Sequence, residues 1–314
     1  MGELDFARNA IESAFPDATE IILTRLNGGV SSDCVSATWL GGEAVVKRAL
    51  PRLKVADLWQ ANPDRILAEA DALNLFKQLT PSCVPGVLAR NDEEQVIVIE
   101  LASPDKRDWR EVLLRGECDP KVGQKLGETL SIWHRETRGK PLPERLENGK
   151  TRLYELRVAP FHLELSTRWL DQQIILRSLA DELMEATECA VHGDFSPKNV
   201  LHGPSGTWVL DAEVAHRGAP VLDLAFLAAH LLIKAIHLPG QRHAIHQILR
   251  AFLGAYTAKL PNLPQRLGKH TGAIIGVRID GKSRVNYLTD DSRDILRSIA
   301  LDLLNGLKIE EMLS

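Results

Sequence analysis

The most informative stretch of the sequence begins with His192-Gly193-Asp194-Phe195-Ser196-Pro197-Lys198-Asn199 and continues to Ala225. Two short apolar runs follow this motif, residues 200–202 and 207–210, and the turn Gly203-Pro204-Ser205-Gly206 separates them. A turn of this kind between two apolar runs predicts a β-hairpin. Because a hairpin brings its two open ends together, we expect Asn199, where the first strand begins, to lie beside Asp211, where the second strand ends.

The residue types at the base of this hairpin suit phosphate chemistry. An amide oxygen from Asn199 beside a carboxylate from Asp211 offers the oxygen ligands that Mg²⁺ prefers, and Mg²⁺ is commonly shared with substrate phosphates. Asp194 lies five residues before Asn199, on the predicted loop that enters the hairpin. A carboxylate at that place can accept a proton from a substrate hydroxyl. The alternative, an Asp-rich surface hairpin without chemistry, requires three spaced signals to coincide by accident.

The order of an Asp, an Asn five residues later and a second Asp after a short hairpin resembles the phosphoryl-transfer apparatus of the protein-kinase fold. With His-Gly-Asp at residues 192–194 and Gly218-x-Pro220-x-x-Asp223 further on, the sequence is similar to the aminoglycoside phosphotransferase and choline kinase family of small-molecule kinases. This resemblance implies a catalytic base at Asp194, metal ligands at Asn199 and Asp211, and a brace for the catalytic loop at Asp223. It leaves Glu213 open, as a residue that helps at the metal or faces the substrate.

The N-terminal third of the chain shows strand patterns, and the remainder shows mostly helical ones. Apolar runs bounded by turn residues predict about five strands, and helical spacing predicts helices over residues 5–15 and 65–76. The predicted strands cover residues 21–26, 34–40, 43–48, 84–89 and 95–100. The resemblance implies an α+β, bilobal protein-kinase-like fold. We therefore expect an antiparallel, β-rich N-terminal lobe over residues 1–102, a mostly helical C-terminal lobe over residues 103–314, and a hinge at about residues 99–104.

Lys47 stands at the end of an Ala-Val-Val run in the third predicted strand. A lone lysine at a strand end is usually only solvated, but the resemblance implies that Lys47 contacts the nucleotide phosphates. The next predicted helix places Glu69 on the same side as its apolar stripe. Because an unpaired buried carboxylate is costly, we expect Glu69 to pair with Lys47.

The remaining nucleotide contacts are expected in a Gly-rich turn and in the hinge. The turn over residues 27–33 contains glycines that allow close backbone approach to a phosphate and serines whose hydroxyls can bind its oxygens, although an ordinary turn has the same composition. The resemblance implies that backbone groups of the hinge bind the adenine edge, with Ile99 guarding the pocket; the alternative for the hinge is a plain linker. The predicted contacts are Gly28, Gly29, Ser31 and Ser32 in the turn, and Glu100 and Ala102 in the hinge.

A second phosphate motif, Gly276-Val277-Arg278-Ile279-Asp280-Gly281-Lys282-Ser283, satisfies the P-loop pattern, and the apolar residues 273–275 before it could form a strand. Its context argues against a P-loop, because only 31 residues follow Ser283 and they do not provide further parallel strands. We favour a polar turn with solvated charges. The alternative is that Arg278, Lys282 and Arg284 reach an anionic part of the substrate or of ATP.

Composition narrows the class of protein. The formal net charge of this 314-residue chain is −4, with Lys and Arg scattered rather than clustered, so we expect no nucleic-acid partner. The N-terminus lacks the apolar segment of a signal peptide, and the longest apolar run, residues 221–236, contains charged residues. The four cysteines form no Cys-x-x-Cys pair, which favours reduced thiols. We expect a cytoplasmic protein without a membrane partner.

These observations together predict an ATP- and Mg²⁺-dependent phosphotransferase. The implied reaction moves the γ-phosphoryl group of ATP to a hydroxyl of a small molecule, such as a sugar, an amino alcohol or an aminoglycoside-like metabolite. The alternative is a catalytically silent nucleotide-binding regulator with the same fold. A protein kinase is disfavoured, because the sequence has neither Asp-Phe-Gly at residue 211 nor the Ala-Pro-Glu that ends an activation segment.

Overall fold

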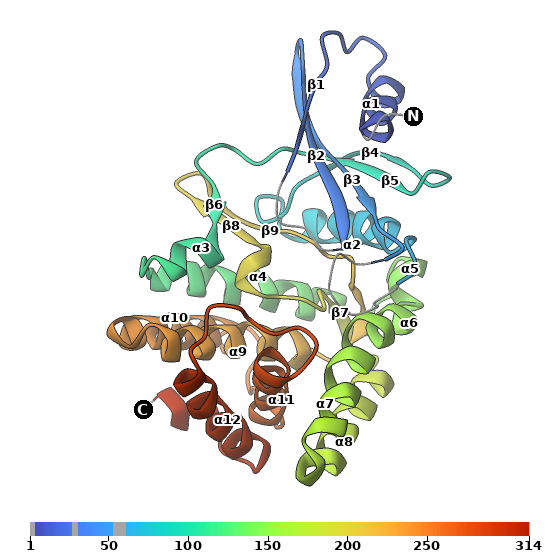
Figure 1. The fold of residues 1–314 in the computed structure, drawn as a ribbon. Helices are drawn as coiled ribbons and strands as arrows, with labels where there is room; N and C mark the ends of the chain where they lie inside the picture. Colours follow the sequence, from blue (N-terminus) through green and yellow to red (C-terminus); the bar gives the residue numbers. More distant parts are fainter. Residues whose placement is uncertain (1–3, 27–30, 53–60, 314) are drawn as a thin grey trace.

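The computed structural model describes residues 4–26, 31–52 and 61–313. Figure 1 shows an antiparallel sheet and helix α2 (Arg65–Leu79) in the upper part of the molecule and a mostly helical assembly in the lower part. The small hairpin of β8 (Val200–Gly203) and β9 (Gly206–Val209) lies between the two. This arrangement is the predicted one: an α+β fold with a β-rich N-terminal lobe and a helical C-terminal lobe.

The upper sheet has five strands in the order β1-β2-β3-β5-β4, and every neighbouring pair is antiparallel. Its strands are β1 (Ile22–Arg25), β2 (Ser32–Trp39), β3 (Gly42–Ala49), β4 (Val87–Asn91) and β5 (Val96–Ile99). Two helices accompany the sheet, α1 (Asp5–Ala14) and α2 (Arg65–Leu79). All five strands and both helices were predicted, with boundaries that differ by a few residues.

Alternation along β3 decides which side chains face which helix. Ala44 and Val46 belong to the cluster that α1 covers, whereas Val45 belongs to the core that includes α2. Side chains of a strand point to opposite faces in turn, so Lys47 lies on the same face as Val45 and is directed towards α2. The sheet thereby presents Lys47 to Glu69.

The lower part consists of helices with three short strand pairings. The helices are α3 (Trp109–Leu114), α4 (Pro120–Thr137), α5 (Glu144–Glu147), α6 (Lys150–Leu153), a π-helical segment (Tyr154–Leu163), α7 (Glu164–Arg168), α8 (Gln173–Glu185), α9 (Val221–His237), α10 (Arg242–Thr257), α11 (Leu267–Asp280) and α12 (Asp290–Leu304). Single 3₁₀ turns cover Leu170–Gln172, Pro197–Asn199, Pro239–Gln241 and Glu311–Leu313. The strands are β6 (Arg107–Asp108), β7 (Cys189–Val191), β8 (Val200–Gly203), β9 (Gly206–Val209) and β10 (His216–Gly218), paired as β6-β8-β9 and β7-β10.

Helix α9 is the central helix of the lower part. Its residues from Val221 to Ala235 are all buried, as expected of a helix that is apolar on nearly every face. Within the described residues, no single helix combines the length and the apolar character that a bilayer span requires. Helix α9 and the segment Pro239–Thr257 meet that requirement only as a pair, and a bend of 118° separates them.

The helical region departs in three places from a run of regular α-helices. The helical pattern over residues 108–137 corresponds to two helices, because Gly116 takes a φ of 80° after α3 and Asp119 caps the new helix α4 that begins at Pro120. Residues 139–150, whose Pro, Glu and Lys content favours a loop, instead contain α5 and the start of α6. The helical stretch that follows contains a π-helical segment around Pro160, which cannot donate a backbone hydrogen bond.

The P-loop pattern does not form a P-loop. Residues 276–280 are the last turns of α11, and Gly276 packs closely against the side chains of Leu165 and Trp169. The rejection of a P-loop is therefore confirmed. The expectation of a polar turn is wrong for Arg278, which lies in the helix, because buried residues on every face of α11 conceal its helical period.

Candidate active site

The hairpin after the His-Gly-Asp motif has the predicted geometry. Val200 pairs with Val209, and the amide of Leu210 donates to the carbonyl of Asn199 at 2.8 Å. The side-chain amide of Asn199 donates to the carbonyl of Asp194 at 2.9 Å. The structure therefore places Asn199 next to the strand end that carries Asp211 and ties it to the loop that carries Asp194.

Asp194 is a buried carboxylate between two cations. Only 4% of the residue is exposed, and its Oδ2 lies 2.8 Å from the Nζ of Lys198 and 3.0 Å from a guanidinium nitrogen of Arg157. The Nε of Arg157 also donates to the carbonyl of Gly193 at 2.8 Å, which fixes the guanidinium. Burial alone would raise the pKa of Asp194, but the charges of Lys198 and Arg157 hold it well below its usual value. Asp194 is therefore ionised at neutral pH.

Lys47 joins the two parts of the molecule. Its Nζ donates to both carboxylate oxygens of Glu69, at 2.6 and 2.8 Å, and to Oδ1 of Asp211 at 3.1 Å. The predicted pairing with Glu69 is confirmed, and the contact with Asp211 is additional. Although burial alone would lower the pKa of Lys47, the two carboxylates raise it well above its usual value, so Lys47 is an ammonium ion.

The backbone at Asp211 adopts a left-handed conformation with a φ of 66°. This region is uncommon for residues other than Gly, although Asp and Asn tolerate it best, and such conformations concentrate at functional sites. The turn is held from the other side by His192, whose Nε2 lies 2.9 Å from the carbonyl of Leu210. His192 thus has a structural role in the loop.

Asp223, at the start of α9, braces the catalytic loop. Its carboxylate accepts hydrogen bonds from the amides of His192 and Gly193, at 2.7 and 2.8 Å. His134 lies 3.2 Å from the same carboxylate through Nε2, and its Nδ1 lies 3.0 Å from the hydroxyl oxygen of Tyr256. The predicted brace is confirmed, and His134 is a buried, hydrogen-bonded core residue rather than a catalytic one.

The sequence left two roles open for Glu213, at the metal or facing the substrate, and the structure adds a salt bridge with Arg65. Its carboxylate accepts from the Nε of Arg65 at 2.9 Å, and Arg65 is fully buried. The guanidinium also donates to the carbonyls of Ser31 and Leu50, at 2.6 and 2.7 Å. The salt bridge between Glu213 and the completely buried Arg65 therefore connects α2 and the ends of β2 and β3 with the segment after Asp211.

The structure describes only two of the four residues that were predicted to bind phosphate in the Gly-rich turn. Gly28 and Gly29 lie outside the described residues. Ser31 and Ser32 are both buried at the start of β2, and the hydroxyl of Ser32 lies 3.5 Å from the sulfur of Cys34. The carbonyl of Ser31 is the one that Arg65 binds.

The hinge residues differ in what their polar groups contact. The carboxylate of Glu100 accepts from the amide of Gly86 at 2.8 Å and from Lys77 at 2.9 Å, so it stabilises the sheet edge. Among the residues that the structure describes, no group accepts a hydrogen bond from the amide of Ala102. This donor is therefore left for a ligand. A cleft of about 430 Å³ adjoins this segment and is lined by Glu43, Glu100, Leu101, Ser103, Lys106 and Trp208.

The residues at the hairpin fit a hard divalent cation. The Nδ2 of Asn199 is bound to the Asp194 carbonyl, and no described residue donates to its Oδ1, so that oxygen is left for a ligand at the hairpin base that Asp211 also adjoins. The described part of the chain contains no cluster of three or more His, Cys, Asp or Glu side chains able to hold a metal. Two oxygen ligands without a full protein cage suit a metal that completes its shell with phosphate oxygens and water.

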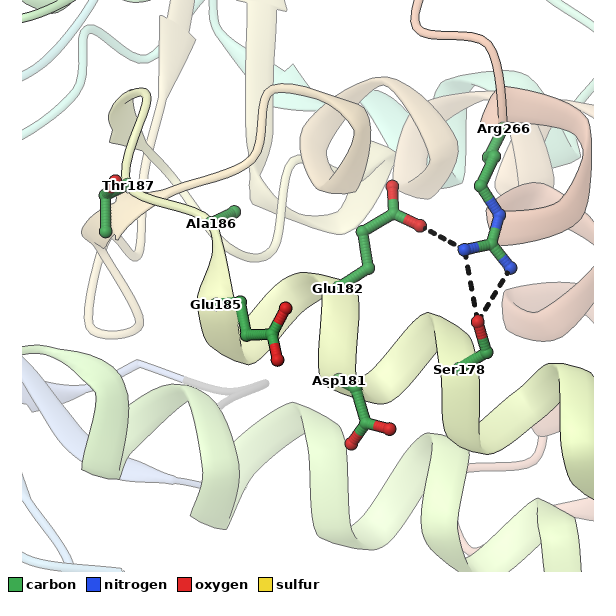
Figure 2. Close-up of a pocket in the computed structure, with 7 residues that line it drawn as sticks. All are labelled: Ser178, Asp181, Glu182, Glu185, Ala186, Thr187 and Arg266. Atoms are coloured by element: carbon green, nitrogen blue, oxygen red, sulfur yellow. Dashed lines mark hydrogen bonds and ion pairs between the residues drawn. The ribbon is translucent and has the colours of Figure 1, made fainter.

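A depression of about 550 Å³ lies elsewhere, along α8. Figure 2 shows Glu182 turned towards Arg266, with which it forms a 2.6 Å contact, while Asp181 projects away from both. None of the predicted site residues lines this depression. We therefore place the candidate active site at the hairpin and not on α8.

Three polar residues of the site were not predicted: Lys198, Arg157 and Arg65. Lys198 lies inside the motif of residues 192–199, four residues after Asp194. This spacing could have indicated the ion pair between the two side chains. Arg157 comes from the π-helical segment, where no local pattern points to the loop. Arg65 is the first residue of α2, a place where sequence alone suggests exposure.

Known proteins resemble this chain in sequence and in fold. Residues 22–262 match the model of the phosphotransferase enzyme family. The chain belongs to this family. It is 26% identical over 233 residues to a methylthioribose kinase of Bacillus mycoides (strain KBAB4), which corresponds to 64% of this chain and 58% of that protein. The chain thus spans less than two thirds of the length of the curated relatives it matches.

Solved structures show the same fold at low identity. The amicoumacin kinase hAmiN in complex with AMP-PNP, Ca²⁺ and Ami superposes with a TM-score of 0.57 at 17% identity, covering 98% of this chain and 95% of that one. The choline kinase LicA from Streptococcus pneumoniae gives a TM-score of 0.54 at 15% identity, covering 96% and 99%. The predicted fold class and the predicted family resemblance are both confirmed.

Proposed function

We propose that this protein transfers the γ-phosphoryl group of ATP to a hydroxyl group of a small molecule. One observation carries the proposal: Asp194, Asn199 and Asp211 meet at the base of one hairpin, and Lys47 reaches Asp211 at 3.1 Å from the other lobe. Relatives that bear the names of methylthioribose kinase and choline kinase support the same reaction class. In the reaction, the acceptor oxygen forms a bond to phosphorus, the bond between the γ-phosphorus and the bridging oxygen breaks, and ADP leaves.

The nucleotide is proposed to bind between the lobes, residues 1–102 and 103–314. Lys47 would hold the phosphates and Glu69 would fix its ammonium group, since the two are in direct contact. Asn199 and Asp211 would hold Mg²⁺, which neutralises phosphate charge as it develops in the transition state. The turn residues Gly28, Gly29, Ser31 and Ser32 would cover the phosphates, and the hinge from Glu100 to Ala102 would bind the adenine edge.

Asp194 would orient the acceptor hydroxyl and receive its proton. Lys198 and Arg157 both contact Oδ2, and no hydrogen bond reaches Oδ1 from the residues that the structure describes, so Oδ1 is left for the acceptor. A carboxylate with a lowered pKa is a weak base. It therefore takes the proton late, when bond formation to phosphorus has already acidified the hydroxyl, and its main contribution is positioning.

The cytoplasm is the proposed site of action. All four cysteines are free thiols, and Cys83 and Cys189 are buried, as in proteins that are kept reduced.

An assay of ATP consumption over a panel of hydroxylated metabolites, including choline and kanamycin, tests the proposal. At least one compound should support turnover, and Asp194→Asn should lower that turnover by about 10²–10⁴-fold while ATP binding is retained. The matched control is Asp171→Asn, an exposed carboxylate away from the hairpin, which should leave turnover unchanged. Unchanged turnover in Asp194→Asn would contradict the assignment, and ATP binding without any consumption would favour the silent regulator.

A further inference from the structure

A second group of cations lies beyond Asp194, in the interior of the helical lobe. Lys234, on α9, is only 1% exposed. Among the described residues it has no hydrogen-bond or ion-pair partner, and the ring centroid of Tyr287 lies 5.7 Å from its Nζ. A buried ammonium ion in this state is unfavourable, because its charge has lost water without gaining a counter-ion.

Arg278, in the last turn of α11, is partly buried and carries a buried guanidinium nitrogen without a partner. Its Nη1 contacts the hydroxyl of Ser283, but its Nε is buried without a partner, as is the hydroxyl oxygen of Tyr287. No described carboxylate forms an ion pair with Arg278. Two cations and a phenol hydroxyl from three different segments therefore have unused hydrogen-bonding capacity.

The helical geometry of α9 connects these groups with the catalytic base. Phe226, His230 and Lys234 follow one another at intervals of four residues, so they share one face of the helix. The ring of Phe226 lies 5.5 Å from the guanidinium of Arg157, the same group that contacts Asp194. Lys234 lies about 12 Å along the axis from Phe226, and its long side chain leans back towards the N-terminus of the helix. The charge of Asp194 acts to raise the pKa of both Arg278 and His230, against the larger effect of burial, so these groups lie within electrostatic reach of the catalytic base.

Charge is not balanced in this region. Asp194 is already paired with Lys198 and Arg157, and the neighbouring Arg110 has carboxylate partners of its own, Asp108 at 3.3 Å and Glu111 at 3.0 Å. Burial, followed by the charges of Arg278 and Arg110, lowers the pKa of Lys234 to about 7, and the opposing charges of Asp108 and Glu111 are too weak to restore it. Burial and the charges of Arg278 and Lys234 also hold the pKa of His230 well below its usual value. Positive charge thus dominates, and a bound anion would relieve it.

We propose that the phosphoryl acceptor is a small hydroxylated anion, whose carboxylate or phosphate group binds to Lys234 and Arg278 while its hydroxyl faces Asp194. This inference rests on the proposed function and names the acceptor class for it. The hydroxyl proton passes to Asp194, and the anionic group takes no part in bond making. A cationic acceptor would meet like charges at Lys234 and Arg278.

Matched acceptor pairs test the acceptor class in the intact protein. ATP consumption is measured with D-glycerate against glycerol, with ribose 5-phosphate against ribose, and with choline and kanamycin as cations. We expect kcat/KM to be at least tenfold higher for the anionic member of one pair, and the pair that responds shows whether the group is a carboxylate or a phosphate. Equal or better turnover of glycerol, ribose, choline or kanamycin would overturn the inference while leaving phosphoryl transfer intact.

Variants test the site itself. Lys234→Met and Arg278→Met should raise KM for the anionic acceptor at least tenfold, with a smaller change in kcat, whereas the exposed controls Lys259→Met and Arg250→Met should not change KM. An unchanged KM in both test variants would overturn the inference.

Thermal melting gives a readout that does not need turnover or a stable variant. D-glycerate or ribose 5-phosphate should raise the Tm of the wild-type protein more than glycerol or ribose does, and Lys234→Met should lose that increase. If this pattern appears but no compound supports ATP consumption, the anion site is upheld and the proposed phosphoryl transfer is wrong. If neither anion raises the Tm of the wild-type protein above the effect of its neutral analogue, the anion site is wrong.

Discussion

Replacing Asp223 by Asn should lower the free energy of unfolding by about 2–4 kcal/mol. In the native protein, the carboxylate accepts from the amides of His192 and Gly193 and lies 3.2 Å from the Nε2 of His134. Asn keeps the shape but replaces one oxygen by a donor, so at least one buried amide loses its acceptor. Hydrogen bonds to charged groups contribute about 1.5–3 kcal/mol each, and a buried unsatisfied donor costs about 1–3 kcal/mol.

Urea denaturation at pH 7, followed by circular dichroism, measures this loss. The control is Asp302→Asn, an exposed residue of α12, which should change the free energy of unfolding by less than about 0.5 kcal/mol. Asp223→Ala should cost more than Asp223→Asn, since it leaves both amides without an acceptor. A loss below about 0.5 kcal/mol in Asp223→Asn, similar to the control, would refute the idea that this carboxylate holds the catalytic loop.

The same variant has a pH signature whose sign is fixed by the structure. Burial alone would raise the pKa of Asp223, but the hydrogen bond and charge of His134, together with His192, lower it. A carboxylate with a lowered folded-state pKa stabilises the protein above its unfolded-state pKa of about 3.9, and this stabilisation is lost as the pH falls through the folded-state pKa. The difference between wild type and Asp223→Asn should therefore be complete at pH 6 to 7 and shrink below about pH 4. A constant difference down to pH 3 would contradict this reasoning.

Three further variants probe other contacts. Arg65→Met should lower the free energy of unfolding by about 3–5 kcal/mol, because it leaves Glu213 as a buried charge without a partner; double substitution with Glu213→Gln should recover part of the loss in the same urea assay. Lys47→Met should weaken ATP binding or lower kcat by at least about tenfold, measured by calorimetry and turnover, because it removes the ammonium that contacts Asp211. Lys282→Ala should change ATP affinity by less than about twofold, because Lys282 lies in the helical lobe and only approaches Glu164 at 3.8 Å; a loss of nucleotide binding would instead support the P-loop interpretation.

Local patterns predicted the parts of the site that lie close together in the sequence. The turn between two apolar runs fixed the hairpin, and the hairpin alone brings Asn199 next to the strand end at Asp211. The contact of Lys47 with Glu69 was predicted from the helical spacing, which puts Glu69 on the apolar side of its helix, and from the family resemblance, which assigns Lys47 to the nucleotide phosphates. The alternation of side chains along β3, seen in the structure, supplies the other half of this contact.

The contacts that were missed depend on tertiary packing. Arg157 reaches Asp194 from a π-helical segment whose position no local period reveals. Arg65 is buried because several carbonyls and Glu213 surround it, although its place at a helix start suggested exposure. Arg278 was assigned to a polar turn once the P-loop was rejected, whereas in the fold it lies in α11, which packs tightly against Trp169 at Gly276.

Isothermal titration of ATP, with and without Mg²⁺, tests most directly whether the hairpin and Lys47 form one magnesium-nucleotide site. In the wild-type protein, Mg²⁺ should tighten ATP binding by at least about tenfold, and Asp211→Ala should abolish that gain while the protein stays folded. A full Mg²⁺-dependent gain in Asp211→Ala would contradict the account.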